Sequence, residues 1–154
     1  MQTLQHFQAK LSWNKKKDSE HTTVKTYTKS HSIHIEGKED LLISAAKIFK
    51  GDPNLHNPED LLLSSLMSCH MMSYLFLCSK QQIEILSYQD EAVATLETYA
   101  DGSGKIIEVV LQPKVELKNK NLYSIALSLH QEANKLCFIA NSCNFPVIHK
   151  ATTY

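Results

Sequence analysis

The sequence predicts an α+β fold, and three observations lead to this class. Residues 58–80 form a long, apolar segment with strong helix-start signals, and residues 121–137 carry apolar side chains at helical spacing. Segments of alternating apolar and polar residues lie before and after the long helix, as in half-buried strands. Strands and helices that occur in separate runs are typical of α+β proteins. At 154 residues we expect one domain, residues 1–154.

Residues 1–50 are expected to form an antiparallel sheet. The alternating segments are short and are separated by charged or glycine-containing turns, which is typical of consecutive antiparallel strands. The short apolar run at 41–48 is compatible with a strand or a helix. The expected strands are 6–13, 22–29 and 31–36, with a charged turn at 14–20.

The central helix is expected at about residues 57–80. Asn57 can cap the helix, and Pro58 suits its first position, where a missing N–H costs nothing. Glu59 and Asp60 place negative charge at the positive end of the helix dipole. The rest is apolar on every side, which predicts a helix buried on all sides. Because serines, a histidine and two cysteines interrupt it, we expect a core helix of a soluble protein or dimer and no membrane span.

Residues 81–154 are expected to contain a hairpin, a helix and a last strand. A long or kinked strand at 84–99 and its return strand at 105–117 flank a glycine-containing turn. Pro113 cannot donate to a strand ladder, so it predicts a sheet edge or a bulge. An amphipathic helix at 121–137 and a closing strand at 145–152 complete the expected order.

Composition excludes several classes of function. The formal net charge is zero and the basic residues are scattered, which argues against nucleic-acid binding. All 16 basic residues are lysine, so the bidentate guanidinium fork for phosphate or carboxylate is missing. The N-terminus lacks a signal pattern, which predicts a cytoplasmic protein with reduced thiols. The cysteine spacings match no zinc motif, so we expect neither a metal nor a cofactor.

Two of the four cysteines have settings that suggest chemistry. Cys69 lies mid-helix with Ser65 and Ser73 four residues away on either side, which predicts a small lined pocket around this thiol. Cys137 ends the second helix. The two thiols could meet in one core, although spacing alone does not show it. Cys78 is interpreted as an ordinary core residue, since free cysteine is usually a small buried hydrophobe.

Two stretches resemble the OsmC/Ohr family of osmotically induced and organic hydroperoxide resistance proteins. Asn57, Pro58, Glu59 and Leu61 followed by Cys69 resemble the family's first-cysteine motif. Residues 132–142, which contain Cys137, are similar to the segment around its second cysteine. The expected order of strands and helices also matches along nearly the whole chain.

This resemblance implies an OsmC-like fold, with antiparallel sheets around a long buried central helix, in an intertwined homodimer. It further implies a peroxidase active in the response to oxidative stress. Cys69 would attack the peroxide oxygen of an organic hydroperoxide and become a sulfenic acid, Cys137 would condense with it to a disulfide, and a dithiol reductant would reopen the bond. In the hydroperoxide-resistance branch an arginine activates the thiol and is held by a glutamate that Glu59 resembles, so Glu59 would be an orienting carboxylate.

The chain departs from that branch because it contains no arginine. A lysine of the N-terminal turn, Lys15 to Lys17, could supply a point charge without the fork. Glu59 is explained equally well as a helix N-terminal charge. The alternative function is therefore a non-catalytic dimer that binds a small apolar ligand or senses redox state. A third possibility is that the thiols only fill the core.

Overall fold

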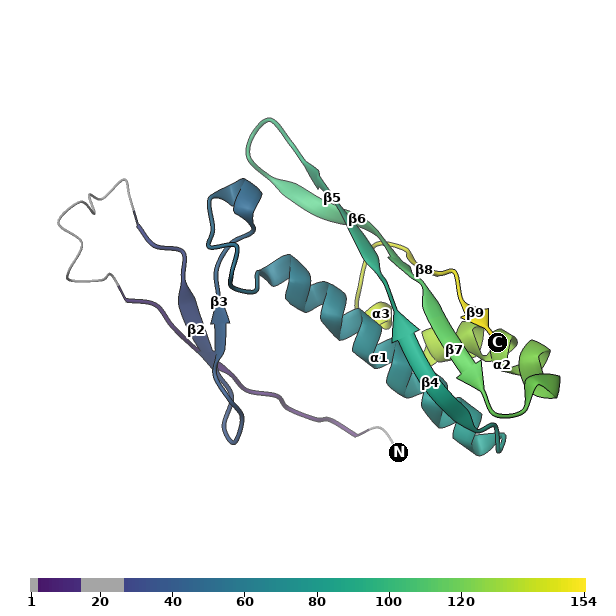
Figure 1. Ribbon diagram of the computed structural model, residues 1–154. Coiled ribbons are helices and arrows are strands. Elements are labelled where there is room, and N and C mark those ends of the chain that lie inside the picture. Colours follow the sequence, from purple (N-terminus) through teal and green to yellow (C-terminus); the bar gives the residue numbers. More distant parts are fainter. Residues whose placement is uncertain (1–2, 15–26) are drawn as a thin grey trace. The chain divides into compact units, whose positions relative to one another are not determined.

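The computed structural model describes residues 3–14 and 27–154 (Figure 1). The chain divides into two compact units, Met1–Leu61 and Leu62–Tyr154. Whether they act as the single domain expected from the sequence stays a prediction. The first unit holds β1 (Lys10–Ser12), β2 (His31–His34), β3 (Leu41–Ile43) and the short 3-10 helix η1 (Lys47–Phe49).

The first unit contains an antiparallel sheet of order β1-β2-β3, as expected. Leu11 pairs with Ile33, which in turn pairs with Leu41. The first strand is shorter than the predicted 6–13, and 41–48 divides into β3 and η1. Of the predicted strand at 22–29, residues 22–26 lie outside the described residues, and 27–29 have no regular structure.

The long helix α1 covers Pro58–Lys80 and begins one residue after the start of the expected helix at about 57–80. Its start is held by a reciprocal pair of hydrogen bonds. The Asp60 backbone N–H donates to the Asn57 side-chain oxygen at 2.9 Å, and the Asn57 amide donates to the Asp60 carboxylate at 2.7 Å. This arrangement satisfies one of the N–H groups that every helix start leaves unpaired. Capping therefore uses Asp60 and leaves Glu59 available for other contacts.

Within one chain, α1 buries a single stripe of side chains four residues apart: Leu66, His70, Tyr74 and Cys78. The opposite stripe, formed by Ser64, Ser68, Met72 and Phe76, is exposed. Met72 is 57% and Phe76 53% exposed, which is unusual for large apolar side chains in the middle of a helix. A single chain therefore buries only one side of α1, whereas the sequence predicted burial on all sides.

The second unit continues from α1 with strands in two three-stranded sheets, of order β4-β7-β9 and β5-β6-β8 (Figure 1). The strands β4 and β7, and likewise β5 and β6, pair antiparallel as expected. The last strands pair parallel, β8 with β6 and β9 with β7, because the chain returns to the sheets after a helix. Both sheets are therefore mixed, where the sequence predicted antiparallel ones. The elements are β4 (Ile85–Asp90), β5 (Val93–Thr98), β6 (Gly104–Leu111), β7 (Pro113–Leu117), η2 (Lys120–Leu122), α2 (Tyr123–Leu136), α3 (Phe138–Asn141), β8 (Val147–His149) and β9 (Thr152–Thr153).

The predicted hairpin strands are each divided in two, and Gln112 marks one division. Its backbone N–H leaves the strand ladder and donates to the Asp90 carboxylate at 2.7 Å. Pro113 then begins β7, the middle strand of its sheet. The edge or bulge predicted for Pro113 is wrong, because a proline can also occupy the first residue of a strand.

Two groups of buried side chains form the core of the second unit. In one, Tyr74 and Cys78 of α1 pack with Val115 and Leu117 of β7 and with the buried face of α2, formed by Ala126, Leu129 and Ala133. In the other, Leu66 packs with Val109 and Leu111 of β6. The helix α1 is long and apolar enough to cross a membrane, a property that core helices of soluble proteins share. Its buried stripe packs against the strands and helix of its own unit.

Candidate functional site

The second unit places Cys69 and Cys137 side by side. Cys69 lies near the middle of α1, and Cys137 follows the last residue of α2. Burial, together with the interaction with the neighbouring Cys69 thiol, raises the pKa of Cys137 to about 11. Two sequence-predicted site residues, 68 positions apart, are thus brought together. All four cysteines are free thiols.

The two thiols differ in access. Cys137 is 1% exposed, and its sulfur accepts a hydrogen bond from the Ala140 backbone N–H at 3.4 Å. Cys69 is half-buried and lines an open cavity of about 390 Å³. A molecule that enters the cavity therefore meets the Cys69 sulfur first. A thiol whose pKa is about 11 is almost entirely protonated at neutral pH, so Cys137 is a poor first nucleophile.

The cavity beside Cys69 is mostly apolar. Apart from the thiol, its one polar side chain is Ser73, which lies one turn further along α1. The hydroxyl of Ser65, one turn before Cys69, donates to its own helix at the Leu62 carbonyl, 2.7 Å away. Of the two serines that the sequence placed around the thiol, only Ser73 therefore lines its cavity. The lining residues are Cys69, Met72, Ser73, Phe76, Leu136 and Phe138.

The other two cysteines lie elsewhere. Cys78 is 1% exposed in the core, and burial raises its pKa. The Cys143 thiol donates to the Ile139 carbonyl at 3.2 Å and packs against the group around Leu66. Neither lines the cavity of Cys69.

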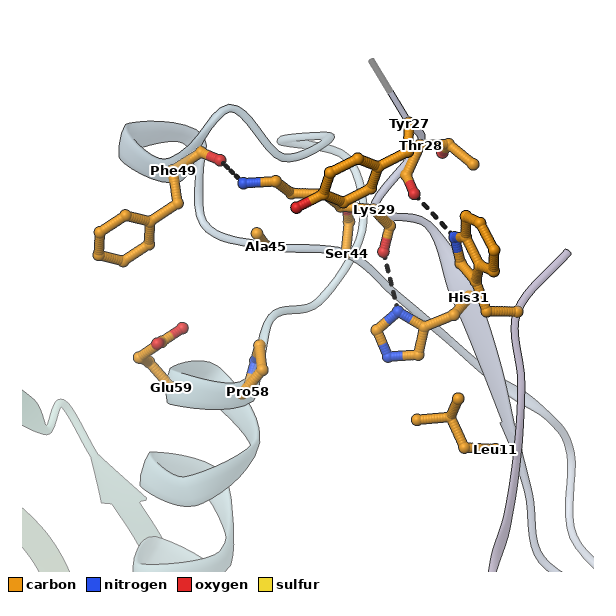
Figure 2. Close-up of a pocket in the computed structure, with 11 residues that line it drawn as sticks. Leu11, Tyr27, Thr28, Lys29, His31, Ser44, Ala45, Phe49, Pro58 and Glu59 are labelled. Atoms are coloured by element: carbon orange, nitrogen blue, oxygen red, sulfur yellow. Dashed lines mark hydrogen bonds between the residues drawn. The ribbon is translucent and has the colours of Figure 1, made fainter. Parts of the chain in front are cut away.

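Glu59 lines a different cavity, of about 560 Å³, within the first unit (Figure 2). One of its carboxylate oxygens is buried and has no hydrogen-bond partner among the described residues. Glu59 precedes Cys69 by ten positions in the sequence. The structure thus places the Glu59 carboxylate at a cavity of the first unit, and the residues that line this cavity do not include Cys69.

A lysine shares the cavity with Glu59. Lys29 donates to the Phe49 carbonyl, and His31 donates to the Lys29 carbonyl at 2.9 Å (Figure 2). Sequence reasoning placed the substitute cation at Lys15 to Lys17, which lie outside the described residues. Lys29 was missed because nothing in its sequence neighbourhood distinguishes it from the other lysines.

A cluster of buried imidazoles was also missed, since the histidines were interpreted mostly as surface or strand residues. His70 of α1 and His130 of α2 are 1% and 3% exposed. The Nε2 atom of His70 lies 3.0 Å from Nδ1 of His130, and Nε2–H of His149 donates to the His130 carbonyl at 2.9 Å. Their positions, 70, 130 and 149, follow no recognisable motif. Among residues 3–14 and 27–154, no group of three or more His, Cys, Asp or Glu side chains could hold a metal ion.

Burial dominates the electrostatics of this histidine cluster. It lowers the pKa of His70 to about 4, with a further contribution from His149. It lowers the pKa of His130 to about 3, with contributions from His70 and then His149. Both rings are therefore neutral at pH 7.

Residues 51–150 match the family model described as OsmC-like protein, and the chain belongs to this family. The resemblance predicted from the two cysteine motifs is confirmed.

Solved structures agree with the OsmC-like fold. An OsmC-like protein of unknown function from Vibrio cholerae is 30% identical, with a TM-score of 0.86 over 97% of this chain and 100% of the other. An OsmC-like protein from Mycoplasma pneumoniae is 15% identical, with a TM-score of 0.73 and 97% of each chain covered. An organic hydroperoxide resistance protein OsmC from Legionella pneumophila is 17% identical, with a TM-score of 0.72 over 99% of this chain and 98% of the other. No functionally curated protein matches the chain.

Proposed function

We propose that the protein is a thiol peroxidase that reduces organic hydroperoxides through Cys69 and Cys137. The observation that carries the proposal is the pairing of an accessible thiol, at an apolar cavity of about 390 Å³, with a buried thiol beside it. An apolar cavity favours the organic part of a hydroperoxide over a small polar peroxide. Membership in a family that includes organic hydroperoxide resistance proteins supports the same activity.

The chemistry has two steps. The Cys69 thiolate attacks the terminal peroxide oxygen, so that the O–O bond breaks, Cys69 becomes a sulfenic acid, and the alkoxide leaves and takes a proton from water to become the alcohol. The Cys137 sulfur then attacks the Cys69 sulfur, the S–O bond breaks, and water leaves as the disulfide forms. A dithiol reductant restores both thiols by exchange.

Glu59 is proposed to orient the cation that activates the thiol. The buried, unpartnered carboxylate oxygen supports this role over a charge that serves only the helix N-terminus, because Asn57 caps the helix with its side-chain oxygen and Asp60 pairs with Asn57. Lys29 is a candidate for the cation because it lines the same cavity, and Lys15 to Lys17 remain candidates.

We further propose an obligate homodimer located in the cytoplasm. The exposed stripe of α1 supports a dimer, because Met72 and Phe76 leave large apolar surfaces uncovered in one chain. A second copy would complete the burial of α1, with an interface above about 2,000 Å².

Sedimentation velocity at micromolar concentration tests whether the protein is a dimer. A dimer is expected for the wild type, and Ser68→Glu, which places a charge in the stripe, should shift it to monomer. The surface substitution Gln131→Glu is the control. A monomeric wild type would contradict the proposal.

The second candidate is a non-catalytic dimer that binds a small apolar ligand or senses redox state. The apolar cavity favours ligand binding, and the absence of arginine removes the cation used by the hydroperoxide-resistance branch.

Consumption of cumene hydroperoxide with excess dithiothreitol separates the two functions. The peroxidase proposal expects turnover by the wild type and none by Cys69→Ser, with Cys78→Ser as the matched control that keeps full activity. If the wild type consumes no more hydroperoxide than Cys69→Ser, the ligand-binding alternative is favoured.

A further inference from the structure

The helices that carry the two thiols are joined by a buried histidine pair. His70 follows Cys69 directly in α1, and His130 lies seven residues before Cys137. The 3.0 Å contact between their rings is the only side-chain hydrogen bond between α1 and α2 among the described residues. The rings are stacked, with an interplanar angle of 12° and centroids 5.3 Å apart.

The His130 ring is fixed from two further directions. Tyr74 of α1 stacks on it at a centroid distance of 3.9 Å and an angle of 10°. His149 of β8 meets it edge-on at 6.5 Å and also donates to its backbone carbonyl. The ring orientation of His130 therefore depends on α1 and β8 together.

The histidine pair and the thiol pair belong to one line of contacts between the helices. The buried face of α2 contains His130 and Ala133 and continues to Cys137, and these side chains pack along α1. A shift of α2 by one residue would translate it by about 1.5 Å and rotate it by about 100°. Such a shift would break the histidine hydrogen bond and would also move Cys137 away from Cys69.

We infer that His70 and His130 are positioning residues, whose hydrogen bond holds α2 against α1 so that Cys137 reaches Cys69. The inference rests on the proposed two-thiol function. It names the residues that align Cys137 with Cys69 for the second step, in which the disulfide forms. In that step Cys137 loses its proton and its thiolate attacks the sulfur of the Cys69 sulfenic acid, so that the S–S bond forms, the S–O bond breaks, and the hydroxide leaves and takes up a proton to become water.

The hydrogen bond requires that at least one of the two bonded nitrogens stay unprotonated as the acceptor. The second ring nitrogens, Nδ1 of His70 and Nε2 of His130, are buried without a partner among the described residues. Protonation of both rings would place N–H against N–H and bury two like charges. The titratable groups that face the pair are Tyr74 from α1 and His149 from β8, and Lys150 lines the cavity on the outer side of His130. The alignment is therefore expected to be lost in acid.

Closure of the disulfide by diamide tests the inference without a peroxide. Diamide oxidises two thiols to a disulfide and is itself reduced to the hydrazine, so the test is independent of peroxidase activity. His70→Leu and His130→Leu remove the hydrogen bond at similar volume. In the double variant His70→Gln with His130→Asn, side-chain amides replace the two bonded nitrogens.

At pH 7 we expect each Leu variant to close the Cys69–Cys137 bond at least tenfold more slowly than the wild type, and the amide double variant to close it within threefold of the wild-type rate. Free thiols are counted by alkylation and mass spectrometry, and circular dichroism checks folding. Wild-type closure rates in folded Leu variants would overturn the inference. If the Leu variants do not fold, slow closure in the folded amide double variant overturns it.

A second readout separates this inference from the proposed function. With cumene hydroperoxide, dimedone traps the sulfenic acid of Cys69, and we expect more trapped sulfenic acid in the Leu variants than in the wild type. Absence of sulfenic acid in every protein would refute the peroxidase proposal, while the diamide result would still decide the role of the histidines.

Discussion

Acid should destabilise this protein through His70 and His130. Both have folded-state pKa values, about 4 and about 3, that lie below the ordinary value of 6.5. Above pH 6.5 both rings are neutral in the folded and the unfolded chain, and the free energy of unfolding has its full value. As the pH falls toward the folded-state pKa values, this free energy decreases, because the unfolded chain binds protons at His70 and His130 and the folded chain does not. Between pH 7 and pH 5 the loss is about 2 kcal/mol for each ring, or about 4 kcal/mol together.

Urea unfolding followed by circular dichroism at pH 7 and pH 5, at one protein concentration, measures this loss. In the double variant His70→Gln with His130→Asn, most of the difference between the two pH values should disappear. In His6→Gln, which changes an exposed histidine, the difference should persist. Equal stability of the wild type at both pH values, or an unchanged loss in the double variant, would show that the two histidines do not cause the sensitivity to acid.

Three further predictions concern the thiols and the first unit. Because the pKa of Cys137 is about 11, formation of the disulfide from sulfenic Cys69 should accelerate about tenfold per pH unit between pH 7 and 9, measured by stopped flow; a pH-independent rate would contradict this. Cys143→Ser should leave the rate of hydroperoxide consumption unchanged, and a Cys69–Cys143 bond in a peptide map would show that the resolving thiol is misassigned. Gly51→Ala should destabilise the chain by about 3 kcal/mol, since its new Cβ would lie 1.7 Å from the Ala45 carbonyl oxygen; a melting temperature equal to that of the wild type would disprove the clash.

Features that depend on neighbouring residues could be predicted from the sequence. The bounds of α1 follow from Asn57 and Pro58 at its start and from the apolar run up to Lys80. Features set by distant pairing could not. The division at Gln112 depends on Asp90, 22 residues earlier, and the closing strand divides because β8 and β9 pair with different sheets.

The candidate site shows the same contrast. The pairing of Cys69 with Cys137 was expected from the family resemblance, whereas their spacing alone left it open. The histidine cluster was not expected, because a hydrogen bond between residues 60 positions apart leaves no local pattern in the sequence. The sequence also did not predict that a single chain buries only one stripe of α1. An apolar composition does not determine whether the same chain or a second copy covers the other faces.

A single-turnover oxidation shows whether Cys69 and Cys137 reduce a hydroperoxide together. The reduced protein is mixed with one equivalent of cumene hydroperoxide, the remaining thiols are alkylated, and the peptides are mapped by mass spectrometry. We expect that one hydroperoxide is consumed per chain and that Cys69 and Cys137 are joined within that chain, while Cys78 and Cys143 remain free. Four free thiols with the hydroperoxide intact would contradict this expectation.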